Sequence, residues 1–225
     1  MNIVSFSGGK DSTAMLFMML ERGIKVDRVI CVDTTKEFPQ MYEHIEKVQK
    51  LCPVKIEIVK IDFDYWFGER IKTKGHIGEI GYGWPNMLNR WCTALKRDAM
   101  KKLKTKDDIT FIGIAFDEKE RTLIKNVKEN FRYPLVEWGI TEKQALDYCY
   151  SKGFDWGGLY EKCHRVSCWC CPLSRIGALE VLYNDFPDLW KELIEMDKKS
   201  VKKFKANYSV KDLTNRFYQN QNLAF

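Results

Sequence analysis

Strand-like and helix-like segments alternate along the first half of the chain. The runs NIVSF (2–6), VDRVICVD (26–33), KIEIVKID (55–62) and DITFIGIAF (108–116) are typical of β-strands. Helix-like segments separate them: one follows residue 12, and others are PQMYEHIEKVQKL (39–51) and RWCTALKRDAMKKL (90–103). Alternation at this spacing predicts right-handed βαβ units. We therefore expect an α/β fold with a doubly wound, mainly parallel sheet that helices cover on both faces.

The second half of the chain is predicted to be mostly helical. TEKQALDYCYSKG (141–153) is typical of a helix with Thr141 as N-cap and Gly153 at its end, and two further helices flank Pro187. Residues 63–89 have no clear period and are rich in glycine and aromatic residues, and a loop of this length is often functional. We expect an α/β domain over residues 1–175 and a helical extension over 176–225 that packs on it.

Composition indicates an ordinary globular protein. The 225 residues are 45% hydrophobic and 30% charged, and no apolar run has the length that a membrane span needs. The N-terminus has no signal-peptide pattern, so we expect a cytoplasmic protein without a membrane partner. The net charge of +6 suits anionic ligands but is too small to demonstrate nucleic-acid binding. We interpret the lysine runs MKKLKTK and DKKSVKKFK as solvated helix faces rather than RNA-binding patches.

A glycine-rich turn, SGGKDS, joins the first strand to the first helix at residues 7–12. Such a turn in an α/β sheet binds phosphate, because glycines admit the ligand and the helix N-terminus offers free N–H groups. Lys10 adds a positive charge, and Ser7 and Ser12 add hydroxyl donors. The alternative is a tight turn in which Ser12 only caps the helix. We favour phosphate binding, and we expect Lys10 to be exposed, so that Lys10→Ala abolishes binding of the phosphate ligand without unfolding the chain.

The type of phosphate loop can be narrowed. The dinucleotide pattern G-x-G-x-x-G and the Walker pattern G-x-x-x-x-G-K-[ST] are both absent. SGGKDS instead resembles the PP-loop of the ATP pyrophosphatase superfamily, also called the adenine nucleotide alpha hydrolases. The resemblance implies a Rossmann-like fold and cleavage of ATP between its α and β phosphates, assisted by Mg²⁺. It implies an adenylated substrate and pyrophosphate as products, with Lys10 and Asp11 as catalytic residues.

Further segments resemble the phosphoadenosine phosphosulfate (PAPS) reductase-like branch of this superfamily. VDTTKEFPQMYEHI (32–45) is similar to a segment of that branch in which Asp33 and Thr34 would line the nucleotide pocket, with Thr35 in place of the usual glycine. Without the resemblance, Asp33 could equally be a cap of the next helix. YPLVEWGITEKQALDY (133–148) resembles the Pro-Leu-x-x-Trp segment of the branch.

Three more segments carry the resemblance, each with matching and departing residues. RWCTALKRD (90–98) matches at Cys92 and Lys96 but has Trp91 where the branch has its first cysteine. GIAFDEKERT (113–122) matches at Gly113, Glu118 and Arg121, with Ala115 in place of an arginine. LYEKCHRVSCWCCPL (159–173) matches at Tyr160, Arg165, Cys168, Cys171 and Pro172. The predicted nucleotide site is therefore Ser7, Gly8, Gly9, Lys10, Asp11, Ser12, Asp33, Thr34, Lys96, Gly113, Glu118 and Arg165, with Arg121 as a further catalytic residue.

Four of the eight cysteines, at positions 163, 168, 170 and 171, lie within nine residues. So dense a group in a reducing compartment indicates a metal or redox site rather than disulfides. Zinc and a [4Fe–4S] cluster both take four thiolates, so spacing does not separate them. By family analogy Cys92 joins Cys163, Cys168 and Cys171 as ligands, with Cys170 as a substitute. Because some relatives carry such clusters, we favour iron–sulfur.

The resemblance leaves three functions open. The first is ATP-dependent activation of a substrate for sulfur or nitrogen transfer, with tRNA, DNA or a small molecule as acceptor and an unidentified sulfur donor. The second is reduction of PAPS or its unphosphorylated relative APS, which needs a cysteine on a C-terminal tail. The chain ends NRFYQNQNLAF, without a cysteine after Cys171, and this disfavours reduction. The third is a non-catalytic nucleotide-binding module with a structural zinc.

Overall fold

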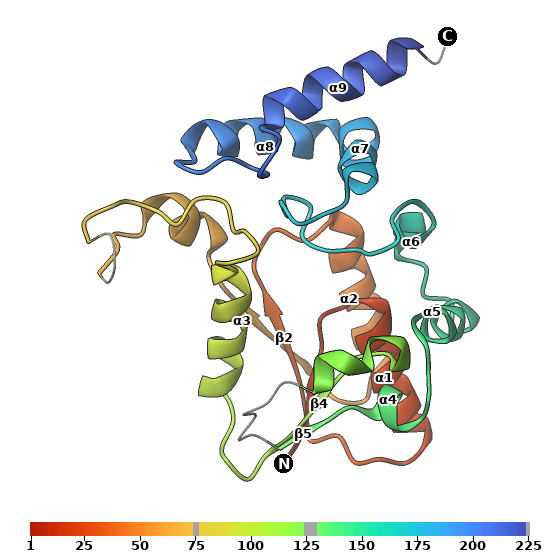
Figure 1. Ribbon diagram of the computed structural model, residues 1–225. Helices are drawn as coiled ribbons and strands as arrows, with labels where there is room; N and C mark the ends of the chain where they lie inside the picture. Colours follow the sequence, from red (N-terminus) through yellow and green to blue (C-terminus); the bar gives the residue numbers. More distant parts are fainter. Residues whose placement is uncertain (74–76, 124–129, 224–225) are drawn as a thin grey trace. The chain divides into compact units, whose positions relative to one another are not determined.

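The computed structural model describes residues 1–73, 77–123 and 130–223 (Figure 1). The chain forms two compact units, each made of segments that are separated in sequence. Unit 1 contains Met1–Asp33, Pro39–Ile61 and Lys96–Leu159, and unit 2 contains Thr34–Phe38, Asp62–Leu95 and Tyr160–Phe225. The predicted division at residue 175 stays a prediction. No helix in the described ranges is long and apolar enough to cross a membrane.

Unit 1 is built around a five-stranded sheet in the order β3-β2-β1-β4-β5. The strands are β1 (Asn2–Ser5), β2 (Arg28–Asp33), β3 (Ile56–Lys60), β4 (Ile109–Ile112) and β5 (Phe131–Arg132). Every pairing is parallel, and in the centre Val4 lies opposite both Val29 and Phe111. These side chains are buried, as expected for strands covered on both faces. The predicted doubly wound parallel sheet is confirmed.

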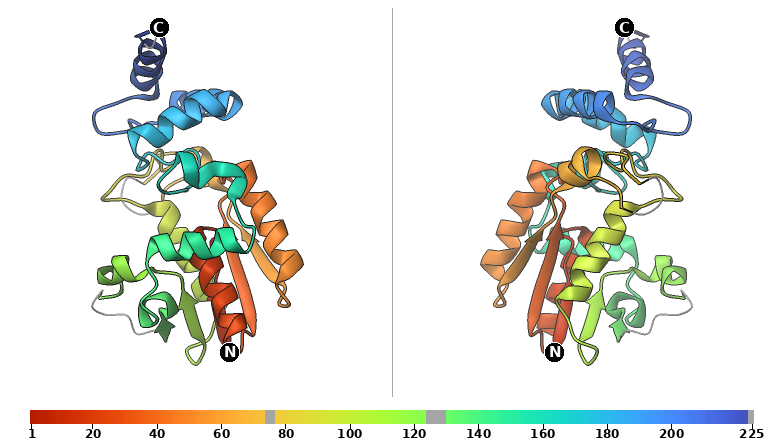
Figure 2. Two further views of the ribbon diagram at one scale, coloured as in Figure 1. Left: turned by 90° about the vertical axis from the view of Figure 1, so that its right-hand side faces the viewer. Right: turned by 90° about the vertical axis from the view of Figure 1, so that its left-hand side faces the viewer.

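Helices cover both faces of this sheet. Figures 1 and 2 show α1 (Lys10–Glu21), α2 (Pro39–Leu51) and α5 (Glu142–Ser151) on one face and α3 (Trp91–Lys102) on the other. Apolar residues of α1 and α5 meet in the core, and Met15, Leu16 and Ala145 are fully buried. Thr141 caps α5 in a capping box with Gln144, as the sequence predicts for its N-cap. Three short elements complete the unit: η2 (Phe116–Thr122), α4 (Pro134–Glu137) and η3 (Trp156–Gly158).

The strand order creates a crevice at the carboxyl ends of β1 and β4. The chain leaves β1 toward β2 on one side and returns to β4 on the other side, and ligands bind at such a reversal. Gly113, directly after β4, lies against the first turn of α1: a Cβ atom there would be 2.7 Å from the backbone nitrogen of Ser12. The close approach requires glycine at position 113, and it brings the end of β4 against the loop that follows β1.

Unit 2 is mainly helical. It contains η1 (Tyr65–Glu69), most of α6 (Leu159–Lys162), and the helices α7 (Ile176–Asp185), α8 (Pro187–Lys199) and α9 (Val210–Leu223). Trp84 packs edge-on against Phe204 and donates its indole N–H to Asp197. The predicted loop 63–89 therefore contains ordered structure, including η1 and an antiparallel bridge between Ile71 and Ile80. Its residues 74–76 lie outside the described residues.

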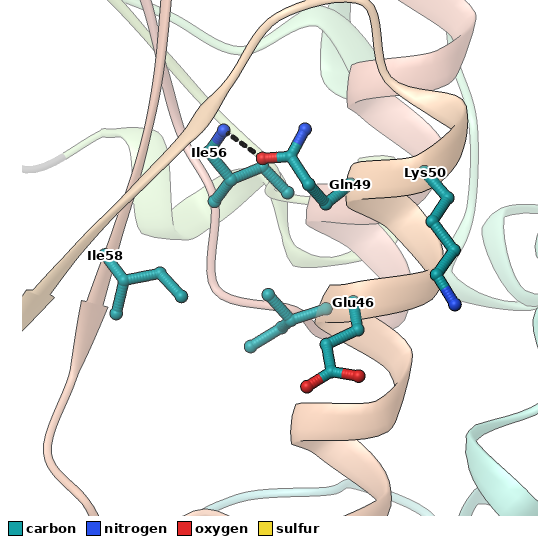
Figure 3. Close-up of a pocket in the computed structure, with 6 residues that line it drawn as sticks. Glu46, Gln49, Lys50, Ile56 and Ile58 are labelled. Carbon is teal, nitrogen blue, oxygen red and sulfur yellow. Dashed lines mark hydrogen bonds between the residues drawn. The ribbon is translucent and has the colours of Figure 1, made fainter.

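A shallow apolar pocket lies between α2 and the edge strand β3 in unit 1. Ile45, Ile56 and Ile58 line it, together with Glu46, Gln49 and Lys50. Figure 3 shows Gln49 accepting a hydrogen bond from the backbone of Ile56, while the ammonium of Lys50 points away from the isoleucines. Polar groups do not converge inside this pocket, so we place the candidate chemistry at the sheet's crevice instead.

Candidate functional site

The predicted phosphate loop follows β1 and is closed by its own serines. The Ser12 hydroxyl accepts from the Ser7 backbone at 3.2 Å, lies 3.0 Å from the Ser7 hydroxyl, and donates to the Gly9 carbonyl at 3.0 Å. Gly9 is the N-cap of α1, without a side-chain cap. Ser12 therefore ties the loop together instead of capping the helix. The first N–H groups of α1 remain without intrahelical partners at the mouth of the crevice.

Two aromatic residues that the sequence analysis did not include support this loop. Trp156 donates its indole N–H to the Gly8 carbonyl at 2.8 Å. The His44 ring stacks on Trp156 at 4.2 Å and hydrogen-bonds the hydroxyl of Thr13, in α1, at 2.9 Å. Burial lowers the pKa of His44 to about 3, so its ring is neutral at ordinary pH. No local motif announces these contacts, because Gly8 and Trp156 are 148 positions apart.

Lys10 is buried, and the expectation that it would be exposed is wrong. Its side chain is 8% exposed, and its ammonium lies 2.7 Å from Glu142 and 3.2 Å from Asp11. Glu142 was not among the predicted site residues. It is the first residue of α5, and its backbone nitrogen donates to Asp117 in η2. The fold of unit 1 therefore supplies a carboxylate to the lysine of the phosphate loop.

Three carboxylates gather around this lysine. Oxygen atoms of Asp11, Glu118 and Glu142 all lie within 4.8 Å of one another, the single such group of potential metal ligands in the described ranges. Burial is the largest effect on Asp11 and raises its pKa, while Lys10 acts in the opposite direction. Arg121 forms an ion pair with Glu118 and is about half exposed. The group is rich in oxygen ligands, and such ligands suit a hard divalent cation.

The remaining predicted residues of unit 1 lie on different elements. Asp33 is buried at the end of β2 and accepts a hydrogen bond from Tyr42 at 3.1 Å. Lys96 is half-buried on α3. Gly113 is the close-approach glycine described above. Ala115 is fully buried, so the backbone at this position leaves no room for the arginine of the resembling segment.

In unit 2, Thr34 lies beside the cysteine-rich loop. Its hydroxyl is 3.5 Å from the sulfur of Cys168, and a carboxylate oxygen of Glu37 is 3.4 Å from the same sulfur. Trp169 donates its backbone N–H to the carbonyl of Lys36 at 3.0 Å, which fixes the two segments to each other. Lys36 is itself buried and is held by Asp64 at 3.0 Å and Glu192 at 2.7 Å.

The other predicted ligands differ in accessibility. Cys163 and Cys170 are buried, and burial raises the pKa of both thiols. Cys171 is half-buried and donates its backbone N–H to Cys168, and Cys92 is half-buried in the first turn of α3. Arg165 is exposed. No three cysteine sulfurs in the described ranges form a ready group of ligands, so the set Cys92, Cys163, Cys168 and Cys171 stays a prediction.

Comparison with known proteins gives one family and several similar chains. The model of the phosphoadenosine phosphosulfate reductase domain matches residues 1–174. The uncharacterized protein MJ0066 of Methanocaldococcus jannaschii is 28% identical over 211 residues, 84% of this chain and 40% of that protein. The uncharacterized nin region protein ORF290 of Escherichia phage lambda is 28% identical over 173 residues, 64% of this chain and 57% of that protein. The chain thus spans about half the length of these two relatives.

Among solved structures, one similar chain is the U34-tRNA thiolase NcsA from Methanococcus maripaludis with its [4Fe-4S] cluster. It has a TM-score of 0.48 and 15% sequence identity, and the match covers 98% of this chain and 71% of that one.

Proposed function

Because the chain belongs to the phosphoadenosine phosphosulfate reductase domain family, we propose that it binds ATP at residues Ser7–Ser12 and cleaves it to AMP and pyrophosphate. The acceptor attacks the α phosphorus and forms a bond to it. The bond from that phosphorus to the bridging oxygen breaks, and pyrophosphate leaves with the electron pair. Sulfur from a donor at the oxidation level of sulfide then forms a bond to the activated carbon, and AMP leaves with the electron pair of the bond to its oxygen. The acceptor is a tRNA, a DNA or a small molecule, and the protein works in the cytoplasm.

The observation that carries this proposal is the geometry of the phosphate loop. Ser7 and Ser12 hold it in a fixed shape, and Gly113 packs against it from the end of β4, directly before the N-terminus of α1. A helix N-terminus at a sheet's reversal point is a site for phosphate. The intact loop with Lys10 suits a nucleotide that keeps its β and γ phosphates.

The charges at the loop favour a nucleotide that arrives with a cation. Asp11, Glu118 and Glu142 face one ammonium, Lys10, and one guanidinium, Arg121. The formal sum of these five groups is −1, which repels a bare polyphosphate. Oxygen ligands in this number fit Mg²⁺, and Asp11, Glu118 and Glu142 would hold it. Mg²⁺ would supply positive charge that offsets the phosphates, and Lys10 would donate to a phosphate oxygen.

The sulfur part of the proposal is supported by the contact between Thr34 and Cys168. Thr34 is a predicted nucleotide contact and Cys168 a predicted thiol ligand, and they touch within unit 2. Soft thiolates fit iron or zinc, and Cys92, Cys163, Cys168 and Cys171 would hold the metal, with Cys170 as a substitute. We propose a [4Fe–4S] cluster, which supplies thiophilic iron when bound. Metal analysis and the absorption spectrum of anaerobically purified protein separate it from zinc.

The test measures pyrophosphate and AMP formed from ATP with Mg²⁺, with candidate acceptors added in turn. Removing only Lys10 leaves carboxylates uncompensated in a buried place, so Lys10→Ala is expected to lower stability as well as activity. The informative set is therefore Lys10→Gln, Glu142→Gln and the double variant. We expect Lys10→Gln to abolish ATP binding even when combined with Glu142→Gln, which relieves the charge imbalance. The exposed Glu43→Gln on α2 is the matched control.

Two results would contradict the proposal. The first is unchanged ATP affinity in a folded Lys10→Gln/Glu142→Gln variant, which would remove the phosphate loop from the site. The second is release of sulfite from PAPS with a thiol reductant but no pyrophosphate from ATP, which would establish a sulfonucleotide reductase.

A further inference from the structure

Residues 65–73 and 77–83 of unit 2 form a surface element that the proposed reaction does not use. The backbone folds back so that Tyr82 donates its N–H to the carbonyl of Trp66 at 3.0 Å, and Gly81 donates to Arg70 at 2.8 Å. Gly81 has a φ of +69°, and a Cβ atom there would lie 2.3 Å from the carbonyl oxygen of Phe67. Only glycine fits at position 81, so the sequence specifies this backbone conformation.

The element carries a row of stacked rings that ends in a guanidinium. The rings of Trp91 and Tyr82 are 5.8 Å apart at 26°, and those of Tyr82 and Trp66 are 5.9 Å apart at 24°. Arg70 lies over Trp66 at 4.5 Å, and hydrogen bonds to the phenols of Tyr65 and Tyr82 raise its pKa. Trp91 is buried at one end, whereas Tyr65 is 39% exposed beside the other. The accessible end therefore presents a phenol and a preorganised guanidinium.

Positive charge lies beside this stack. Lys72 is 6.0 Å from the Tyr82 ring and pairs with Glu79 at 2.6 Å. Lys202 is close enough that the charge of Lys72 lowers its pKa, in addition to the larger effect of burial. Lys72 is buried and its charge is balanced by Glu79, so Arg70 and the half-buried Lys202 are the cations that this surface offers. Lys202 belongs to the run DKKSVKKFK, which the sequence analysis interprets as a solvated face, and its half-burial next to Lys72 departs from that interpretation.

We propose that Tyr65 and Arg70, with Lys202, form a docking surface for an unpaired segment of RNA, and that the stack of Trp66 and Tyr82 holds Arg70 in place. Unpaired bases stack on aromatic rings and on arginine planes, and lysines take the phosphates between them. RNA is the chosen occupant because its loops offer unstacked bases, whereas the bases of duplex DNA are enclosed. This proposal makes RNA the acceptor of the proposed sulfur transfer, and in that respect it rests on the proposed function.

Exposed aliphatic residues on the same segment suit a protein partner instead. Ile71, Met87 and Leu88 are 61%, 68% and 100% exposed. Such a patch alone would fit a protein contact. The stacked guanidinium of Arg70 and the neighbouring ammonium of Lys202 are what favour a polyanion with planar bases, and a protein contact becomes an outcome of the test.

The experiment measures the fluorescence anisotropy of a labelled, unstructured single-stranded RNA titrated with the full chain at several salt concentrations. We expect binding that weakens with salt, and Arg70→Ala and Tyr65→Ala should each weaken it about tenfold, since stacking contributes that much per base. Arg70→Lys keeps the positive charge but loses the planar guanidinium on which a base can stack, so it should weaken RNA binding as Arg70→Ala does. Lys202→Ala should reduce the slope of log affinity against log salt by about 0.7 to 1.

The control variant is Arg97→Ala, which removes an exposed arginine of α3 in unit 1. It should leave RNA affinity unchanged, and thermal melting should show that every variant is folded. Equal affinity of Arg70→Ala, Tyr65→Ala and the unaltered chain would overturn the proposal. So would tighter binding of single-stranded DNA of the same sequence. Absence of RNA binding, together with self-association that Leu88→Glu abolishes, would assign the surface to a protein contact.

The two proposals fail separately. If both hold, Lys10→Gln/Glu142→Gln loses ATP but binds RNA, and Arg70→Ala loses RNA but binds ATP. An RNA surface without ATP cleavage would refute only the proposed function. ATP cleavage without RNA binding would refute only the docking surface.

Discussion

Thr35 has a backbone conformation that a β-branched residue rarely adopts. Its φ is +61°, in the left-handed region, where the resembling family segment has glycine. The Thr35 hydroxyl donates to the Thr34 carbonyl at 2.6 Å, and the ion pairs of the next residue, Lys36, hold the segment in place. Thr35 therefore holds a conformation that glycine adopts without strain. Such strain persists where the surroundings over-determine it, here beside Cys168.

Thr35→Gly should stabilise the protein. Relief of the left-handed strain is worth about 1 kcal/mol, less a part lost to the greater freedom of glycine in the unfolded chain. The measurement is the free energy of unfolding in urea. The same substitution at Thr93, exposed within α3, should instead lower stability by about 0.5 kcal/mol or more. A loss of stability in Thr35→Gly similar to that in Thr93→Gly would show that position 35 carries no strain.

His44 should make stability fall in mild acid. Its pKa is about 3 in the folded chain, because burial disfavours the charged ring, against 6.5 as its ordinary value. Because the pKa is lowered in the folded chain, the stability that the neutral His44 ring contributes is complete above pH 6.5 and is lost as the pH falls. The slope approaches about 1.4 kcal/mol per pH unit below that value. Lys47 adds to the lowering, and Asp155 opposes it.

The measurement compares urea unfolding of the unaltered chain and His44→Phe between pH 7 and pH 4. The unaltered chain should lose more stability over this interval, and the difference between the two should grow as pH falls. Asp108, whose pKa is about 2, acts only below its ordinary value of 3.8. Asp11 has a raised pKa and acts with the opposite sign, but it is present in both chains. If the free energy of unfolding falls equally with pH in the two chains, His44 does not cause the loss of stability.

At the scale of elements, the sequence predicts well those helix and strand boundaries that local sequence signals determine. The bounds of α2, Pro39–Leu51, follow from a proline at the first position and a clear apolar period. The start and end of α5 follow from Thr141 and from Gly153, whose φ is +78°. The two-residue strand β5 has too little sequence to carry a period, and it exists because β4 offers a free edge.

The candidate site also has one part that local sequence signals predict and another part that tertiary packing creates. The loop Ser7–Ser12 is a local motif, and its position at the end of β1 is as predicted. Glu142 reaches Lys10 only because α5 packs on α1, and Trp156 reaches Gly8 only through η3. These contacts depend on tertiary packing, so neither residue carries a signal in its own neighbourhood. The predicted exposure of Lys10 failed for the same reason.

Trp156→Phe should loosen the phosphate loop without unfolding the protein. The ring can still stack on His44, but the buried Gly8 carbonyl loses its donor. The expected result is an increase of about fivefold in KM for ATP, from a hydrogen bond worth about 1 kcal/mol, with little change in kcat. Trp190→Phe is the matched control, since it also loses an indole hydrogen bond, to Thr214, but in unit 2. An equal change in KM in both variants would contradict a specific role for Trp156.

At the scale of the whole molecule, unit 2 is assembled from three separated segments. Its core joins Phe38 to Phe186 and Trp84 to Phe204, which lie far apart in the sequence. Lys36 is buried and takes one of its two carboxylates, Glu192, from α8. Residues on both sides of position 175 therefore complete the same interior.

A chain that ends at residue 175 should not fold properly. It would leave Trp84 without Phe204 and Asp197, Phe38 without Phe186, and Lys36 with Asp64 as its one remaining carboxylate. We expect a shallow thermal transition and aggregation, measured by circular dichroism and size-exclusion chromatography. The control ends at Gln219 and keeps the buried Leu213 and Phe217 of α9, so it should melt like the full chain. A sharp transition in the 175-residue chain would support the domain division predicted from the sequence.

The interleaving of the two units also constrains how proteins of this kind can change during evolution. Recombination cannot exchange unit 2 as one continuous piece, because two segments of unit 1 separate its three segments in the sequence. A crossover that imports a foreign Tyr160–Phe225 region must also match Thr34–Phe38 and Asp62–Leu95. The cysteine-rich loop and the segment around Thr34 must therefore be inherited together.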